Sequence, residues 1–333
     1  MTGFLLYYKI ISATSGTVNL KEETNIQTYH CDPFWRMLQP YLPKSNRLTT
    51  NNLPEEYFIP ILGMDIHIDH YKPVVSKGRL ILFHGVGGNG RLLSCIALPL
   101  ARAGFEVICP DLPLYGCTCY IKDITYDTWV SCSVEIVKYY QSNESLPIFL
   151  FGFSAGGMLA YQIACKSQNI RGLIVSCILD QREKTVTRNS ARNPLLGLMA
   201  KPLMTAMHTF AGRVKIPMKW IGNMKAIVNQ KEVARILMKD KKSSGVRVPI
   251  NFIYSMLNPE IRIEPEQFTA CPVLLSHPGD DRWTDIKLSN LFYNRLACKK
   301  QTVILEGAGH FPMEAIGLKQ MEQACIQFLE QNL

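Results

Sequence analysis

Residues 146–158 read LPIFLFGFSAGGM, and this stretch decides the fold. The apolar run at 147–151 lies between a proline and a glycine, which predicts a fully buried parallel strand. Residues 156–164 then predict a helix. Ser154 stands at the junction in a G-x-S-x-G pattern, whose small residues allow the sharp turn that exposes a serine hydroxyl above a sheet. The pattern predicts a nucleophilic serine, and the alternative is a serine that only caps the helix.

A serine hydroxyl is a weak nucleophile, so this interpretation requires a histidine base, an orienting carboxylate and hydrogen-bond donors for an oxyanion. His310 lies in GAGHFP, immediately after a predicted strand, on the kind of loop where active sites gather. Asp281 precedes it, next to Asp280 in HPGDDRWTD and just past another predicted strand. Each residue alone is more often structural, but the chain order Ser, Asp, His favours a catalytic set.

Strands and helices alternate along most of the chain. A β-hairpin is predicted at 56–70, further strands at 79–83, 106–109, 170–179, 272–276 and 301–305, and helices at 91–104, 126–140, 285–297 and 317–331. Strict alternation of strand and helix implies a mostly parallel sheet whose two faces are covered by helices. The sequence therefore predicts the α/β class.

The alternation is interrupted at 182–265, which we expect to form an inserted helical cap. This segment carries 16 Lys and Arg against 5 Asp and Glu, so its charge is +11, whereas the whole chain is +9. It also holds seven methionines, shows no clear strand, and repeats apolar residues at helical spacing in Leu195, Met199, Leu203 and Met207. The predicted domains are an N-terminal extension at 1–54 with a helix near 33–42, a first core part at 55–181, the cap at 182–265 and a second core part at 266–333.

Composition excludes several classes of protein. The chain has 333 residues, 47% hydrophobic and 19% charged, which is typical of a globular protein and excludes disorder, collagen-like repeats and disulfide scaffolds. Eleven scattered cysteines, several inside predicted buried strands, indicate a reducing compartment, and we expect a cytoplasmic protein. No apolar run reaches the length of a membrane-spanning helix, and FLLYYKII near the N-terminus follows no basic segment. We therefore expect neither a signal peptide nor an anchor.

Neither a metal nor a cofactor is expected. Cys117 and Cys119 are too close together for an ordinary zinc half-site. His67 and His70 stand three apart on a predicted strand and point to opposite faces, so we expect them to be solvated rather than to share a metal. The glycine-rich HGVGGNG at 84–90 lacks the lysine of a phosphate loop and the spacing of a dinucleotide fingerprint, which leaves an oxyanion-binding loop as the functional interpretation.

Five motifs together resemble the α/β-hydrolase family: HGVGGNG after a strand, PDLPLYG after the next strand, GFSAGG, HPGDDRWT and GAGHFP. The resemblance extends from about Glu55 to the C-terminus and points to the branch of monoacylglycerol lipases and lysophospholipases. It implies an eight-stranded, mostly parallel sheet with a helical cap after the sixth strand, a nucleophile elbow at Ser154, and oxyanion N–H groups from Val86 and Ala155. It implies no cofactor.

In such a family His310 would be the base, and the usual acid motif is G-x-x-D. A proline stands at the glycine position of this chain, which makes Asp281 the matching aspartate and leaves Asp280 as an alternative. Some members carry the acid after the sixth strand, where this chain has Asp180. The implied chemistry is attack of Ser154 on an acyl carbonyl, proton transfer by the histidine, and release of the acyl group by water.

The sequence leaves three functions open. The first is a serine hydrolase that cleaves carboxylic esters, in particular lipid-like acyl esters, through an acyl-enzyme on Ser154. The second is a peptidase or thioesterase with the same residues, and the third is a catalytically silent ligand-binding homologue.

The cap adds an expectation about partners. Its Met and Leu side chains are suited to line an acyl pocket and its basic residues to contact an anionic membrane surface, with a solvated lid as the alternative. No nucleic acid partner is expected, because no recognition motif accompanies the basic residues. The sequence predicts no oligomeric state.

Overall fold

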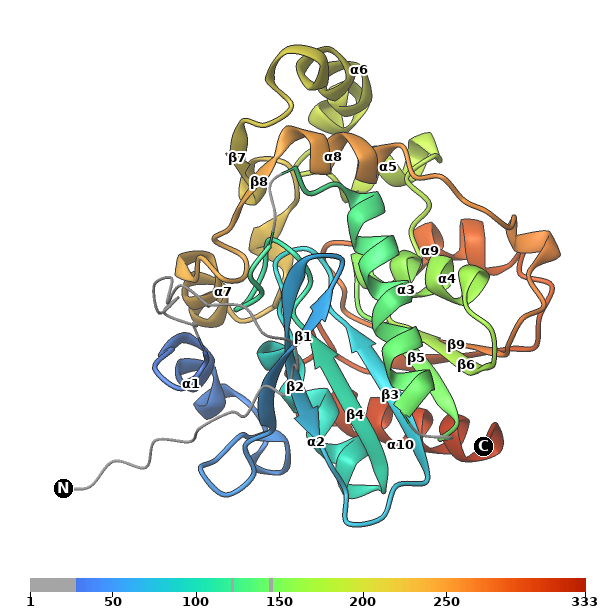
Figure 1. Cartoon of the computed structure of the whole chain (residues 1–333). Coiled ribbons are helices and arrows are strands. Elements are labelled where there is room, and N and C mark those ends of the chain that lie inside the picture. The colour runs from blue at the N-terminus through green and yellow to red at the C-terminus, as the bar shows by residue number, and fades with distance from the viewer. Residues whose placement is uncertain (1–27, 121–122, 144–145) are drawn as a thin grey trace, which may run out of the picture.

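The structure is a computed structural model that describes residues 28–120, 123–143 and 146–333 (Figure 1). The first half of the predicted N-terminal extension, up to residue 27, therefore lies outside the described residues. Its second half holds the short helix α1 (Phe34–Leu38) and two 3-10 turns, η1 (Gln39–Tyr41) and η2 (Lys44–Asn46). The helix predicted near 33–42 is thus one α-helical turn that tightens into a 3-10 turn, which is a common way for a helix to end.

A single sheet of eight strands forms the centre of the fold. The strands are β1 (Glu55–Ile61), β2 (Met64–Tyr71), β3 (Gly78–Phe83), β4 (Phe105–Pro110), β5 (Ile148–Gly152), β6 (Ile170–Val175), β9 (Val273–Pro278) and β10 (Lys300–Leu305). They lie in the order β1-β2-β4-β3-β5-β6-β9-β10. Strand β2 is antiparallel to both of its neighbours, and the other pairs are parallel. The predicted class, a mostly parallel α/β sheet, is confirmed.

Helices cover both faces of this sheet (Figure 1). One face carries α3 (Tyr126–Asn143), α4 (Ala155–Lys166) and α9 (Ile286–Tyr293), and the other carries α2 (Ser94–Arg102), which follows the 3-10 turn η3 (Arg91–Leu93), and α10 (Ala315–Gln331). Strands with both faces covered are mostly apolar, and every residue of β3, β4, β5 and β9 is buried. The buried charges Arg79 of β3 and Glu106 of β4 pair with each other. The continuous apolar runs in the sequence have this origin.

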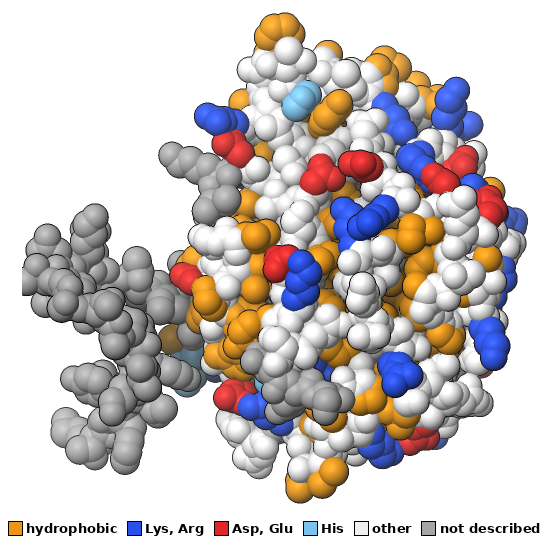
Figure 2. All heavy atoms as spheres, turned by 45° about the vertical axis from the view of Figure 1, so that its right-hand side comes forward, with side chains coloured by type: hydrophobic (Ala, Val, Ile, Leu, Met, Phe, Trp, Pro, Cys, Tyr) orange, Lys and Arg blue, Asp and Glu red, His pale blue; other side chains and the backbone are white. Residues whose placement is uncertain are grey.

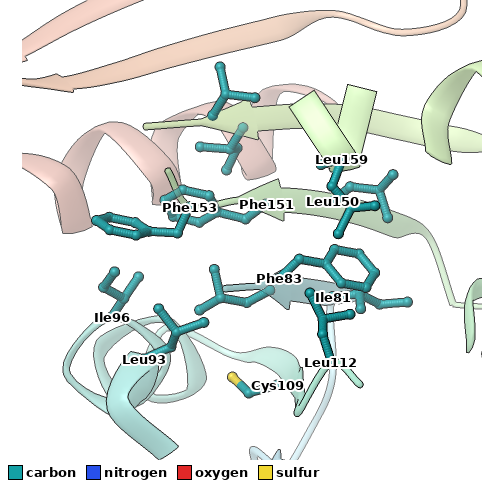
Figure 3. Close-up of a cluster of buried hydrophobic side chains, with 14 of the residues drawn as sticks. Ile81, Phe83, Leu93, Ile96, Cys109, Leu112, Leu150, Phe151, Phe153 and Leu159 are labelled. Carbon is teal, nitrogen blue, oxygen red and sulfur yellow. The ribbon is translucent and has the colours of Figure 1, made fainter. Parts of the chain in front are cut away.

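The hydrophobic core is densest between β3, β5 and the helices on either side of them. Figure 3 shows side chains from both strands meeting those of α2 on one side and α4 on the other. The labelled members are Ile81, Phe83, Leu93, Ile96, Cys109, Leu112, Leu150, Phe151, Phe153 and Leu159. Because burial of one such side chain contributes roughly 1.5–3 kcal/mol, this packing holds the carboxyl ends of β3 and β5 in fixed positions.

The strand order reverses direction between β3 and β5. From β3 the chain moves outward to β4, whereas β5 pairs with the opposite side of β3, where Phe83 is in register with Gly152. Ligand sites of open α/β sheets lie in the crevice outside the carboxyl ends of strands at such a point. The loop after Phe83 and the turn after Gly152 therefore meet where a site is expected.

The cap segment forms helices above the carboxyl edge of the sheet (Figure 1). Its elements are α5 (Lys184–Ser190), α6 (Pro194–Ala211), α7 (Lys231–Lys239), α8 (Ile250–Leu257) and the 3-10 turns η4 (Met218–Trp220), η5 (Met224–Ala226) and η6 (Pro265–Gln267). A helical insertion after β6 is thus present. The division of the chain at residues 54, 181 and 265 stays a prediction.

Two features of the cap differ from the sequence prediction. The first is a pair of three-residue strands, β7 (Lys215–Pro217) and β8 (Arg247–Pro249), which pair antiparallel where no strand was expected. Strands this short leave no periodic pattern in the sequence, since periodicity needs at least four residues to be visible.

The second difference is the orientation of α6. Its predicted apolar side faces solvent, because Leu195 is 74% exposed and Met199 and Leu203 are also exposed. The small residues Gly197 and Ala200, together with Met204, face inward instead. Periodicity predicted the helix but not its buried face, because α6 is apolar on several sides.

Other element ends also shift. Strand β6 ends at Val175, before the predicted end at 179, and α9 ends at Tyr293 rather than 297. None of the eleven cysteines, all of which are described, forms a disulfide. Within the described residues, no helix combines the length and the apolar character that crossing a membrane requires.

Candidate active site

Ser154 lies on a strained turn between β5 and α4. Its backbone has φ 55° and ψ −125°, a conformation that non-glycine residues rarely adopt, and its N–H donates a hydrogen bond of 2.8 Å to Ser176 Oγ. A side chain at Gly152 would bring its Cβ to 2.0 Å from the carbonyl oxygen of Gly156, so the turn can form only with glycine there. The sequence pattern around the serine therefore reflects a steric requirement.

Three side chains from distant parts of the chain meet at this turn. Ser154 Oγ lies 2.8 Å from His310 Nε2, and His310 Nδ1 lies 2.8 Å from Asp281 Oδ2. His310 comes from the loop after β10, Asp281 from the loop after β9, and Ser154 from the turn after β5. Because all three strands are parallel, their carboxyl ends share one edge of the sheet, and this brings the three groups into contact.

The Asp281 carboxylate is held by several donors. It accepts hydrogen bonds of 2.8 Å from the backbone N–H groups of Trp283 and Thr284 and from the Thr284 hydroxyl. Burial by itself raises the pKa of Asp281, but the contact with His310 and these N–H donors outweigh it and lower the pKa to about 2. The carboxylate is therefore ionised at neutral pH, and it orients the imidazole so that Nε2 faces the serine.

The two alternative acids are engaged elsewhere. Asp280 contacts Arg282 at 3.1 Å and accepts a hydrogen bond from Asn229 at 3.0 Å. Asp180 is buried and accepts hydrogen bonds from Arg182. Of the three candidate aspartates, all within the described residues, only Asp281 contacts the His310 ring.

The predicted oxyanion groups lie beside the serine. Val86 and Ala155 both border the space above Ser154, and in the described part of the chain neither N–H donates a backbone hydrogen bond. A Cβ on Gly85 would lie 2.8 Å from the Ala155 nitrogen, so the loop after β3 touches the turn directly. The Ala155 N–H at the N-terminus of α4 and the Val86 N–H of the loop after β3 are together suited to bind a developing negative charge.

His84 anchors that loop. Its Nε2 accepts the Leu112 N–H at 3.0 Å, so Nδ1 carries the proton and donates to the Gly85 carbonyl at 2.8 Å. Burial lowers the pKa of His84, which keeps the ring neutral and this bonding pattern intact.

Three residues near the site were not singled out from the sequence. Ser176 holds the Ser154 backbone, Thr284 holds Asp281, and the Trp283 ring lies 4.8 Å from the His310 ring. Thr284 follows Asp281 by three residues, a spacing typical of turns in which a carboxylate binds the backbone, so the sequence held a signal for it. Ser176 had no such signal, because its role depends on β6 lying next to β5.

Two apolar cavities meet at Ser154. The larger has ≈ 800 Å³ of empty space, including space open to solvent, and apolar lining residues that include Met158, Leu179, Ala200, Met218, Met256 and Leu257. The smaller has ≈ 410 Å³ measured in the same way, and its apolar lining residues are Val86, Leu92, Leu93, Phe153, Ile227, Leu237 and Phe311.

A buried charged cluster lies away from this site and corrects a prediction. His67 and His70 were expected to be solvated, but both are buried, and His67 Nε2 lies 2.8 Å from Glu56. The residues Glu56, His67 and Asp69 could together hold a metal ion. However, Arg91 already contacts Glu56 and Asp69, so a cation would have to displace a guanidinium that neutralises the same carboxylates.

The eight-stranded sheet, the strained serine turn and the contacts with a histidine and an aspartate define an α/β-hydrolase. The family model described as Serine aminopeptidase, S33 matches residues 75–314, which is most of the chain. The chain therefore belongs to this family.

Solved structures with the same fold are similar over most of their length. A soluble variant of monoglyceride lipase from Saccharomyces cerevisiae, in complex with a substrate analog, has a TM-score of 0.70 and 19% identity and covers 87% of this chain and 98% of its own. A carboxyl esterase from Bacillus coagulans has a TM-score of 0.65 and 17% identity, and the match covers 84% of this chain and 98% of that protein. The monoacylglycerol lipase of Paleococcus ferrophilus has a TM-score of 0.61 and 16% identity, and the match covers 80% of this chain and 99% of that protein. At such identities the likeness concerns the fold.

One curated relative matches a shorter stretch. The Magnesium-chelatase 30 kDa subunit of Rhodobacter capsulatus is 31% identical over 111 residues. The match spans 31% of this chain and 36% of that protein.

Proposed function

We propose that this chain is a serine hydrolase that cleaves carboxylic esters through an acyl-enzyme on Ser154. The observation that carries the proposal is the continuous contact from Ser154 Oγ to His310 Nε2, at 2.8 Å, and from His310 Nδ1 to Asp281 Oδ2, at 2.8 Å, at the meeting point of two apolar cavities. A serine on a strained turn next to a base is the arrangement that activates a hydroxyl.

The reaction proceeds in two halves. Ser154 Oγ attacks the acyl carbonyl while its proton moves to His310 Nε2, and the Val86 and Ala155 N–H groups stabilise the oxyanion. The carbon–oxygen bond to the alcohol then breaks, and the alcohol oxygen takes the proton from Nε2. Water, deprotonated by the same nitrogen, attacks the acyl-serine and restores the hydroxyl. Throughout, the Asp281 carboxylate stabilises the imidazolium.

The cavity linings favour an ester over the amino-terminal residue of a peptide. An aminopeptidase must bind a substrate ammonium group, and a buried ammonium without a counter-ion is strongly unfavourable. Among the described residues, neither cavity is lined by Asp or Glu. An uncharged ester has no such requirement. The larger cavity, lined by flexible Met and Leu side chains, fits an acyl chain longer than acetyl.

The test combines a covalent label with a substrate panel. A fluorophosphonate should label the purified protein on Ser154 and leave Ser154→Ala unlabelled. Esters, thioesters and aminoacyl amides with matched acyl groups should then be compared by kcat/KM, with esters of medium-chain acids highest. Labelling without any turnover would instead favour a ligand-binding homologue, and preference for the amide or the thioester would overturn the ester assignment.

We also propose that the tip of the cap contacts anionic membrane surfaces. The exposed apolar side of α6 includes Phe210, which is 92% exposed, and the exposed basic residues Lys184, Arg188, Arg192 and Lys215 lie in the segments before and after this helix. Figure 2 shows apolar side chains gathered at the top of the molecule, with Lys and Arg side chains on the surface below them. Apolar insertion combined with basic attraction is the physical basis of peripheral binding.

Vesicle co-sedimentation tests this second proposal. The protein should bind phosphatidylserine-containing vesicles more tightly at low salt than at high salt, because salt screens the basic residues. Replacing Phe210 and Leu203 by Ser should weaken binding without changing the hydrolysis of a dissolved short ester. Absence of vesicle binding at low salt would leave a solvated lid.

A further inference from the structure

The two cavities at Ser154 have different access to His310. The ring of His310 borders the smaller cavity, together with Phe311 and Phe153, and does not border the larger one. In ester cleavage the protonated base must reach the oxygen of the departing alcohol, at hydrogen-bond distance. If the proposed hydrolysis holds, the alcohol therefore departs into the smaller cavity, and the acyl chain occupies the larger one.

The smaller cavity offers almost no polar side chains. Those that border it are Ser154 and His310, which react, and His84, whose two ring nitrogens are already hydrogen-bonded to Gly85 and Leu112. The remaining side chains are the apolar ones named above, from the loop after β3, the 3-10 turn before α2, the serine turn, the cap and the loop after β10. Within the described residues, no lining side chain is free to bind a hydroxyl group of an alcohol. The backbone of the loop after β3 also borders the cavity, but the Gly88 N–H donates to the Gly85 carbonyl and the Gly87 carbonyl accepts from the Ser244 hydroxyl.

This composition discriminates between alcohols. A hydroxyl that leaves water and finds no partner loses its hydrogen bonds with water, which disfavours it by roughly tenfold or more per group. A glycerol leaving group carries two hydroxyls besides the one in the ester bond, so this unfavourable free energy applies to two hydroxyls. An alkyl group of the same length gains from leaving water instead.

We propose that the smaller cavity selects an apolar leaving group, so that the preferred substrates are esters of alkyl or aryl alcohols rather than glycerol esters. The inference rests on the proposed ester hydrolysis and adds the chemistry of the alcohol. It differs from what the name of a monoglyceride lipase implies, although the fold is shared with such a protein.

The sharpest test uses two esters with the same acyl group and the same alcohol carbon skeleton. Propyl octanoate and 1-monooctanoylglycerol differ only in two hydroxyls, and both should be assayed with the full chain at concentrations where they are monomeric. We expect kcat/KM for propyl octanoate to exceed that for the glycerol ester by about a hundredfold, roughly tenfold for each of the two hydroxyls. Glycerol is intrinsically the better leaving group, so this preference could not come from reactivity.

Two variants assign the preference to the smaller cavity. Ile227→Thr adds a hydroxyl to its wall and should narrow the ratio between the two esters, whereas Met218→Gln in the larger cavity should leave that ratio unchanged and alter the preference for acyl length. If the wild-type enzyme cleaves 1-monooctanoylglycerol as fast as propyl octanoate or faster, the inference is wrong even though ester hydrolysis stands. If neither ester is cleaved, the proposed function itself fails.

Discussion

Two buried histidines of this chain contact carboxylates at nearly the same distance, yet their surroundings differ. His310 lies 2.8 Å from one carboxylate, and its second nitrogen faces the Ser154 hydroxyl above two cavities. His67 lies 2.8 Å from Glu56 and 2.9 Å from Asp111. One ring therefore keeps a nitrogen available for proton transfer, whereas both nitrogens of the other face fixed negative charges.

The electrostatic consequences follow from that difference. Burial lowers the pKa of His67, but the charges of Asp111, Glu56 and Asp69 outweigh it and raise the pKa to about 10. A histidine that stays protonated at neutral pH cannot act as a base, but it stabilises the carboxylates around it. The cluster also reaches the loop after β3, because Asp111 accepts the Gly90 N–H at 2.6 Å. A histidine next to a carboxylate thus stabilises the structure at His67 and is suited to catalysis at His310.

The largest effect should come from the reacting pair. Ser154→Ala and His310→Ala should each lower kcat on an ester substrate by a factor on the order of 10⁶, since the serine and its base act as a unit. Initial rates measure the loss, and circular dichroism with thermal unfolding should show an intact fold. Substantial activity in either variant would remove the mechanism.

Loss of the orienting carboxylate should have a smaller effect on kcat than loss of the serine or its base. Asp281→Asn keeps the shape of the side chain but removes the charge that stabilises the imidazolium, and a loss of about 10⁴ in kcat is expected. Asp280→Asn and Asp180→Asn are matched controls, because both contact arginines instead of His310, and they should retain most of the activity. A larger loss at Asp180 than at Asp281 would assign the acid to the residue after β6.

Replacing His67 should lower the stability of the protein far more than its activity. His67→Gln leaves Glu56, Asp69 and Asp111 without one of their cations, and breaking such a buried pair typically costs about 3 kcal/mol of unfolding free energy. Chemical denaturation should reveal this loss, whereas kcat/KM of the folded variant should fall far less than in Asp281→Asn. His30→Gln, at an exposed site, should be nearly neutral. An unchanged midpoint in His67→Gln would contradict a stabilising role.

The contributions of His67 and of Asp281 to the unfolding free energy should respond to pH in opposite directions. These are the smallest of the expected effects. The folded-state pKa of His67 is raised, so its contribution to stability is complete below about pH 6.5 and is lost as the pH rises through about 10. The folded-state pKa of Asp281 is lowered, so its contribution is present above about pH 4 and is lost as the pH falls through about 2.

Unfolding free energies measured across the pH range should show both effects. The stability difference between wild type and His67→Gln should shrink above pH 10, and that between wild type and Asp281→Asn should shrink toward pH 2. A His67→Gln difference that grows with rising pH would indicate that His67 is neutral in the folded protein.

The amino-acid sequence by itself determined the class of fold and the residues to examine. Buried parallel strands need continuous apolar runs, and a turn as tight as that at Ser154 needs small neighbours, so both leave local patterns. The order of Ser154, Asp281 and His310 was visible for the same reason, since each follows a predicted strand.

Only the tertiary structure decided what those residues contact. Which aspartate meets His310, that His67 is buried among carboxylates, and that α6 turns its Leu and Met side chains outward all depend on segments far apart in the chain. Local patterns carry no information on such neighbours, because burial and electrostatic partners arise when strand order and helix packing bring distant side chains together. The tertiary structure likewise decides that His310 borders only the smaller of the two cavities.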